Sequence, residues 1–253
     1  MTRRTVCWFS AGAASAVATK LTLANPPTDD IVVAYTDTGS EHPDNARFLD
    51  ECEAWLGVPI IRLRSEKYAS IWEVFEKRRF LVSPNGALCT GELKKKVRYA
   101  FERPDDIQVF GYTIEEERRA NRFREQNPGV DLSTPLIEYG LNKSDCLAMI
   151  ANAGIDLPVM YQLGYRNNNC IGCVKGGMGY WNKIRRDFPD TFDRMARIER
   201  ELGATVLRDK GKPLYLDTLD PNRGSHADEP SFECSLLCSA AEDTINNGRD
   251  NTC

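Results

Sequence analysis

The sequence predicts an α/β fold, with a doubly wound, mostly parallel sheet of five strands and a helical C-terminal part. Two observations support this prediction. Short apolar runs alternate with segments of helical composition through the first half of the chain, and the strand pattern fades after about residue 130. Such alternation is typical of parallel strands joined by right-handed crossovers. The 253 residues, 42% of them hydrophobic, supply enough apolar material for one such domain and an appendage.

The individual elements can be placed in order along the chain. The apolar runs predict strands at 6–9, 31–35, 60–63 and 107–111. The segments between them predict helices at 13–24, 43–56, 68–79 and 92–101. Pro43 suits the first turn of its helix, and Gly57 suits the position just past its end. Further helices are predicted from Asn142 onward and over 188–202.

Composition divides the chain into three expected parts. Residues 1–135 form the α/β domain. Residues 136–208 form a helical part that contains a glycine- and asparagine-rich loop with two cysteines. Residues 209–253 are polar and rich in glycine and proline, which indicates an extended tail.

Charge and cysteine usage restrict the class of protein only weakly. The net charge of −4 favours no partner, and the basic clusters at 77–79, 94–96, 118–119 and 183–186 each suit either a solvated helix face or a nucleic-acid contact. Nine cysteines, an odd number, argue against a disulfide framework. No apolar run is long enough to cross a bilayer or to form a signal peptide, so we expect a cytoplasmic protein without membrane contact.

A turn of small residues follows the first predicted strand directly and leads into a helix. These residues, called the anion loop below, are Ser10, Ala11, Gly12, Ala13, Ala14 and Ser15. Small residues let the backbone approach a ligand, and the amides at a helix start favour an anion, most often phosphate. The loop has neither the Rossmann nor the Walker A glycine spacing. The alternative is a plain strand-to-helix turn.

Two further polar segments follow predicted strands, where open parallel sheets bind their ligands. Asp37, Thr38 and Gly39 follow the second strand, and Asp37 could hold a ribose hydroxyl or a metal ion; the alternative is a capping turn. The segment from Gly111 to Arg119 follows the fourth strand. Its acidic and basic side chains could grip phosphates and magnesium, or could begin an exposed charged helix.

The cysteines suggest a metal site. Cys170 and Cys173 form a C-x-x-C pair in a glycine-rich loop, and Cys89 is the best third ligand. Cys234 and Cys238, one helical turn apart, are candidates for a fourth. Three cysteines suit a [4Fe–4S] cluster with an open iron, and four suit a closed site. Zinc, a redox pair and no metal at all remain open. Cys7, Cys52 and Cys146 are expected to be packing residues.

Together these segments resemble, in the same order, the motifs of the phosphoadenosine-phosphosulfate (PAPS) reductase and PP-loop ATP pyrophosphatase superfamily, the adenine-nucleotide α-hydrolases. The resemblance spans residues 6 to about 180. Ser10, Gly12 and Ser15 fit the PP-loop pattern Ser-Gly-Gly-x-Asp-Ser, whereas Ala11 and Ala14 depart from it. The other matching segments are 37–39, 89–94, 111–119 and 169–173.

The resemblance implies a Rossmann-like fold of the α-hydrolase type and a set of site residues. It implies catalytic roles for Ser10, Ser15, Asp37 and Arg118. It implies nucleotide contacts from the anion loop and from Asp37, Thr38, Gly39, Gly111, Glu116 and Arg119. Because Ala14 replaces the aspartate of the loop, Mg²⁺ would be held by Asp37 or Glu116.

The implied function is an ATP pyrophosphatase that splits the α–β phosphate bond and adenylates a substrate, expected to be DNA or tRNA, for sulfur transfer such as phosphorothioation. A cysteine desulfurase or another sulfur donor is then an expected partner. The oligomeric state of the chain is left open. One alternative is a PAPS or APS reductase that uses Cys234 beside Glu233. Another is a nucleotide-binding component without turnover, which Ala11 and Ala14 favour.

Overall fold

The computed structural model describes residues 3–83 and 86–229. The chain forms two compact units that interleave along the sequence. Among the described residues, unit 1 comprises 3–37, 42–64 and 97–168, and unit 2 comprises 38–41, 65–83, 86–96 and 169–229. The three-part division expected from composition stays a prediction.

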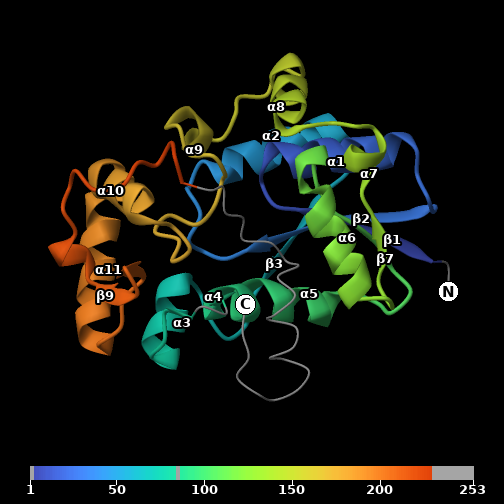
Figure 1. Ribbon diagram of the computed structural model, residues 1–253. Coiled ribbons are helices and arrows are strands. Elements are labelled where there is room, and N and C mark those ends of the chain that lie inside the picture. The colour runs from blue at the N-terminus through green and yellow to red at the C-terminus, as the bar shows by residue number, and fades with distance from the viewer. Residues whose placement is uncertain (1–2, 84–85, 230–253) are drawn as a thin grey trace. The chain divides into compact units, whose positions relative to one another are not determined.

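Unit 1 contains a five-stranded, all-parallel sheet with the order β3-β2-β1-β6-β7 (Figure 1). Its strands are β1 (Arg4–Phe9), β2 (Asp30–Asp37), β3 (Ile60–Arg64), β6 (Ile107–Val109) and β7 (Asp131–Ser133). The predicted α/β class and the number of strands are confirmed. β6 ends two residues before its predicted end, and β7 has no strand pattern in the sequence.

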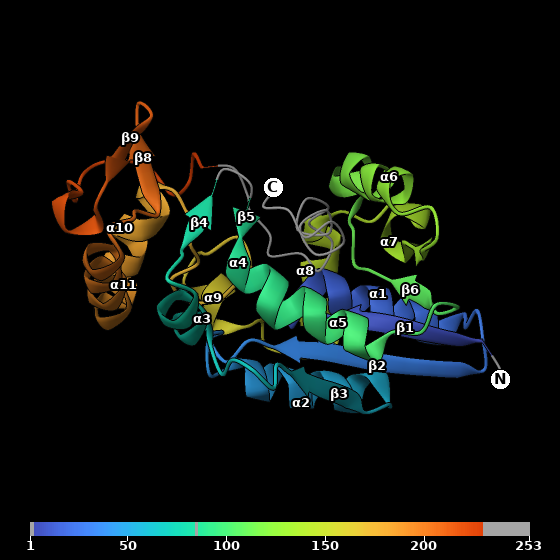
Figure 2. The same ribbon diagram turned by 90° about the horizontal axis from the view of Figure 1, so that it is seen from below.

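Helices cover both faces of this sheet, as a doubly wound fold requires. Successive residues of a strand point to opposite faces. Phe9 packs against Phe48 of α2, with ring centroids 6.3 Å apart, and Trp8 packs against Phe101 of α5 at 6.0 Å. Figures 1 and 2 accordingly show α2 on one side of the strands and α5 on the other. The helices of unit 1 are α1 (Ala13–Ala24), α2 (Asn45–Leu56), α5 (Lys96–Phe101), α6 (Glu117–Gln126), α7 (Pro135–Glu138), α8 (Lys143–Asn152) and α9 (Val159–Gln162).

The core of unit 1 lies between the sheet and the layer formed by α1, α2 and α8. It contains Phe9, Val17 and Phe48, and also the three cysteines expected to be packing residues, Cys7, Cys52 and Cys146. All three thiols are free and buried, which confirms that expectation. Gly57 ends α2 with a left-handed backbone (φ +77°), as predicted, and its N–H donates to the oxygen of Glu53 over 2.9 Å.

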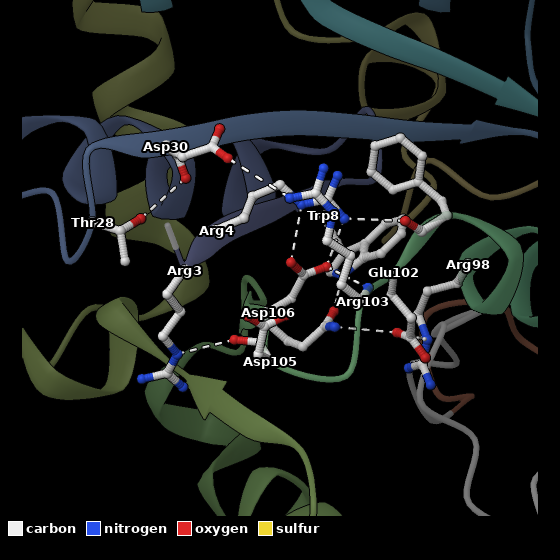
Figure 3. Close-up of polar contacts among 12 residues, drawn as sticks. Arg3, Arg4, Trp8, Thr28, Asp30, Arg98, Glu102, Arg103, Asp105 and Asp106 are labelled. Carbon is white, nitrogen blue, oxygen red and sulfur yellow. Dashed lines mark hydrogen bonds and ion pairs between the residues drawn. The ribbon is translucent and has the colours of Figure 1, made fainter. Parts of the chain in front are cut away.

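A buried ion pair fixes the start of the central strand. Arg4 donates from Nη2 to Asp106 over 2.6 Å and from Nε over 3.0 Å, and the two side chains are 8% and 0% exposed. Arg4 also donates to the backbone oxygen of Phe101. Figure 3 shows Arg4 and Asp106 with the polar residues around them, and Arg4 is the first residue of β1. The pair joins β1 to the chain that enters β6.

Unit 2 is mainly helical, with two short hairpins. Its elements are α3 (Ile71–Arg78), β4 (Val82–Ser83), β5 (Gly86–Ala87), α4 (Leu88–Thr90), α10 (Met178–Asp187), α11 (Pro189–Leu202), β8 (Leu207–Asp209) and β9 (Lys212–Leu214). A π-helix, Gly91–Lys95, joins α4 to α5 where the sequence predicts one regular helix. The segment expected to be an extended tail forms β9 and a 3-10 helix, Leu216–Thr218; beyond residue 229 it lies outside the described residues. Among the helices of the described ranges, none has the length and apolar character needed to span a membrane.

Candidate functional site

The anion loop connects β1 to α1 and is tied together by one hydroxyl. Ser15 is buried, and its Oγ accepts from the N–H of Ser10 over 3.0 Å and from Ser10 Oγ over 3.1 Å. The same Oγ donates to the backbone oxygen of Gly12 over 2.9 Å. Ser10 itself is exposed. In this geometry Ser15 shapes the loop, and Ser10 is the hydroxyl that a ligand could reach.

The backbone of the loop is left-handed at one residue, directly before the N-cap of α1. Ala11 has a φ of +55°, a left-handed conformation that costs a residue other than glycine roughly 1–2 kcal/mol. Gly12 is the N-cap of α1, and α1, all of which is described, has no acidic residue in its first turn. The first amides of a helix have no partner within it, and the helix dipole adds positive potential there. The loop therefore suits an anion.

Gly111, two residues past the end of β6, lies directly against this loop. A Cβ atom at Gly111 would lie 2.7 Å from the N atom of Ser15 and 2.8 Å from the carbonyl carbon of Ala14. Only glycine permits such an approach, because both of these neighbours are backbone atoms. The structure thus brings together two segments that the sequence analysis selected separately, the anion loop and the residue after the fourth strand.

Asp37 and Arg64 form an ion pair across the ends of two neighbouring strands. The residues are register partners in β2 and β3, and Arg64 donates to Asp37 Oδ2 from Nε over 2.8 Å and from Nη2 over 2.5 Å. A metal ion at Asp37 would compete with this guanidinium. In unit 2, Gly39 has a φ of +64°, and a Cβ there would lie 2.0 Å from the oxygen of Ala69. Gly39 is therefore required by the turn itself.

The acidic and basic residues after β6 form a helix start. Thr113 and Glu116 form a capping box, and Arg119 donates from Nη1 to Glu116 Oε1 over 2.6 Å. Arg118 is exposed on α6. The segment therefore has the structure of the second possibility given above, the start of a charged helix. The roles implied for Glu116, Arg118 and Arg119 in nucleotide binding stay predictions.

Three residues at the anion loop or on the segment that reaches it were missed by the sequence analysis. Asn168 donates to the backbone oxygen of Ala11 and to Asn45, and Lys143 donates from Nζ to the backbone oxygen of Arg166 and to the side chain of Asn167. The run of three asparagines at 167–169 is visible in the sequence but was interpreted only as part of the cysteine loop. No sequence spacing relates Asn45 or Lys143 to a loop more than 30 residues away.

The C-x-x-C segment is a turn built around a tyrosine hydroxyl. Tyr180 Oη accepts from the N–H groups of Gly172 and Cys173 over 3.1 and 2.9 Å and donates to the oxygen of Cys170 over 3.3 Å. Cys170 Sγ also lies 3.1 Å from Thr38 Oγ1, within hydrogen-bonding distance.

The structure describes three of the five cysteines that were considered as metal ligands. Cys89, Cys170 and Cys173 are buried and free of disulfides. Within residues 3–83 and 86–229, no group of three or more His, Cys, Asp or Glu side chains is arranged to hold a metal ion. Cys234 and Cys238 lie outside the described residues. The iron–sulfur cluster stays a prediction.

Three curated proteins are similar to the chain. Two uncharacterized proteins of Methanocaldococcus jannaschii are 25% and 22% identical to it over 76% and 77% of this chain. The matches cover 41% and 47% of these two proteins, so the chain spans less than half of their length. An uncharacterized 37.8 kDa protein from the gpa 5′ region of Escherichia phage 186 is 23% identical, over 75% of this chain and 72% of its own. No protein-family model matches the chain.

A solved structure is also similar to the chain. The crystal structure of a PAPS reductase from Candida auris, a phosphate complex, has a TM-score of 0.49 and 14% sequence identity. The likeness covers 67% of this chain and 82% of the reductase chain.

Proposed function

We propose that the chain is an ATP pyrophosphatase, which binds the phosphates of ATP at the anion loop and splits the α–β phosphate bond to adenylate a substrate. The observation that carries the proposal is the loop itself: a left-handed residue, a glycine N-cap and an uncapped helix start at the carboxyl end of the central strand. Ligands of open parallel sheets bind at this edge.

The chemistry asks for positioning and for stabilisation of negative charge. Pyrophosphate leaves with several charges, so catalysis depends on donors that are already oriented towards it. The amides at the start of α1 can supply such donors, and so can the exposed hydroxyl of Ser10 once its proton turns from Ser15 Oγ to the ligand. Ser15 would keep the loop in shape through its three hydrogen bonds.

Magnesium, if used, would need one carboxylate from the protein. Mg²⁺ is commonly held by one or two carboxylates together with substrate phosphates and water. Asp37 or Glu116 would supply the carboxylate, and each now accepts from an arginine, Arg64 or Arg119. The bound ion would neutralise charge on the departing pyrophosphate.

We extend the proposal to a nucleic-acid substrate, DNA or tRNA, activated for sulfur transfer from a desulfurase or another donor. The basic segments and the cysteine-rich composition support this extension. A nucleotide-binding component without turnover would bind ATP and release nothing. A PAPS or APS reductase would instead release sulfite.

The test is product analysis with ATP and Mg²⁺, with and without DNA or tRNA. We expect pyrophosphate to be released and AMP to appear on the substrate or in solution. Ser10→Ala should slow this release about tenfold or more and shift the unfolding temperature only slightly, because it removes one hydrogen bond, to Ser15 Oγ. Ser144→Ala, which removes an exposed hydroxyl on α8, should change neither. Hydrolysis to ADP, or sulfite release from PAPS with thioredoxin, would contradict the proposal.

A further inference from the structure

The segment that follows α9 places one asparagine against the anion loop. Asn168 is 8% exposed, and its Nδ2 donates to the backbone oxygen of Ala11 over 2.7 Å and to Oδ1 of Asn45 over 2.7 Å. An amide group has two hydrogens to donate, and both are used here. The orientation of the Asn168 side chain is therefore fixed from two sides, by the loop and by the first residue of α2.

Burying this pair of asparagines costs free energy that burying an apolar pair would not. Asn168 Oδ1 and Asn45 Nδ2 are buried, and neither has a hydrogen-bond partner within the part of the chain that the structure describes. Buried amide atoms without partners lose the hydrogen bonds that they made to water. An apolar pair of similar size would avoid this loss. Buried polar atoms without hydrogen-bond partners are expected at residues that serve function rather than folding.

The consequence of the Asn168 contact follows from peptide geometry. No described peptide bond is cis, and in a trans peptide the C=O and N–H groups point in opposite directions. Because Asn168 holds the oxygen of Ala11, the N–H of Gly12 in the same peptide group points away from Asn168. This N–H lies at the start of α1 and has no partner inside the helix.

The hydrogen bond also selects one backbone conformation. Ala11 is left-handed, a conformation that alanine leaves readily when nothing holds it. If the Ala11–Gly12 peptide rotated, its carbonyl oxygen would face the position that an anion should take. Lys143 restrains the position of Asn168, because its hydrogen bonds to Arg166 and Asn167 fix the chain directly before that residue.

The geometry points to Asn168 as a positioning residue. It holds the Ala11 carbonyl, with Asn45 fixing its own amide, and so aims the Gly12 N–H at the phosphate group of the ligand. This inference rests on the proposed function, because it assigns Asn168 its role through the phosphates that the anion loop would bind. Asn168 does not itself touch the reacting atoms.

The test compares two equally buried asparagines. Asn182 in unit 2 is 5% exposed, and its Nδ2 also donates twice to backbone oxygens, of Asp220 over 2.9 Å and of Arg223 over 2.7 Å. Asn168→Leu and Asn182→Leu should both lower the unfolding temperature of the free protein. Only Asn168→Leu should weaken the binding of inorganic pyrophosphate and of ATP with Mg²⁺, by about tenfold or more in calorimetric titration. Asn45→Ala, which removes the acceptor that orients Asn168, should weaken binding in the same sense.

The outcomes separate the two proposals. If the unmodified chain binds pyrophosphate and ATP but Asn168→Leu and Asn45→Ala bind them equally well, the inference is overturned and the proposed function stands. A comparable loss in Asn182→Leu would also overturn it, since the effect would then be a general loss of stability. If the unmodified chain binds neither ligand, the proposed function fails and the role of Asn168 fails with it. Should Asn168→Leu not fold, Asn45→Ala decides.

Discussion

At the residue scale, the candidate site depends on contacts that leave no room for a single additional atom. The missing side chain of Gly111 lets the chain that follows β6 lie directly against the backbone of Ala14 and Ser15. Neither neighbour can rotate away, because both contacts are made by main-chain atoms. The shape of the anion loop is therefore set partly by a residue almost 100 positions further along the chain.

The substitution Gly111→Ala tests this dependence. A Cβ within 2.7–2.8 Å of the loop backbone must displace it, so we expect the free energy of unfolding to fall by about 1–3 kcal/mol and ATP binding to weaken. Urea unfolding and calorimetric titration measure the two effects. Gly129→Ala is the matched control, because no atom lies within 4 Å of the Cβ that it adds. Unchanged ATP affinity in Gly111→Ala would show that the loop tolerates displacement.

The two ion pairs at the start of β1 offer a second comparison of single residues. Arg4 and Asp106 are buried, whereas Arg3 and Asp131 are about half exposed. Removing one partner of a buried pair leaves a desolvated charge. Asp106→Ala should therefore cost about 3–5 kcal/mol in urea unfolding, and Asp131→Ala about 1 kcal/mol or less. Equal losses would mean that burial does not decide the value of these pairs.

At the scale of elements, one carboxyl joins α11 to the chain that follows it. Glu199 is fully buried, and its two oxygens accept the N–H groups of Val206 and Leu216, each over 2.7 Å. The hairpin of β8 and β9 lies between these two residues. Burial raises the pKa of Glu199 to about 7, although both hydrogen bonds favour the ionised form.

This raised pKa predicts a pH dependence of stability. The folded chain binds the Glu199 proton more tightly than the unfolded chain, whose pKa is 4.5, so stability falls as the pH rises from about 4.5 to about 7 and is constant above that. The loss should be about 3 kcal/mol. In Glu199→Gln no proton titrates at this position, so unfolding in urea at a series of pH values should show a shallower slope. Identical slopes in both proteins would assign the pH dependence to other groups.

The elements that the sequence predicted well are those whose own residues determine them. Helix α1 begins and ends where its alanine-rich segment does, and Gly57 ends α2. Other elements depend on distant partners: β7 has three residues and exists because β6 provides its hydrogen bonds. The hairpin of β8 and β9 contains Gly211 and Pro213, which favour an extended tail when read alone. The turn between β1 and α1 could likewise be predicted from its own small residues. The contact between Asn45 and Asn168 could not, because these residues meet only in the folded chain.

At the scale of the whole molecule, three cysteines from different elements lie in one apolar core. Cys7 lies in β1, Cys52 in α2 and Cys146 in α8, and all pack into the same apolar cluster of unit 1. Burial raises the pKa of each thiol to about 12. The thiolate is the reactive form, so these groups should be unreactive towards thiol reagents in the folded protein.

Cysteine labelling during unfolding tests whether this core is cooperative. Because one cluster holds all three thiols, we expect them to become reactive at the same denaturant concentration. Pulsed labelling at pH 8, with mass spectrometry of the three peptides, measures each site separately. If Cys146 reacted well before Cys7 and Cys52, α8 would unfold independently of the sheet.

The position of β1 in the sheet has a consequence for synthesis on the ribosome. This strand precedes both of its neighbours along the chain and pairs on one side with β2 and on the other with β6, about 100 residues later. Until β6 has been translated, one edge of a strand whose last four residues, 6–9, are all apolar has no neighbour, and exposed edges of this kind promote aggregation. We therefore expect nascent chains that stop before residue 107 to need a chaperone, and chains extended past β7 to be released from it.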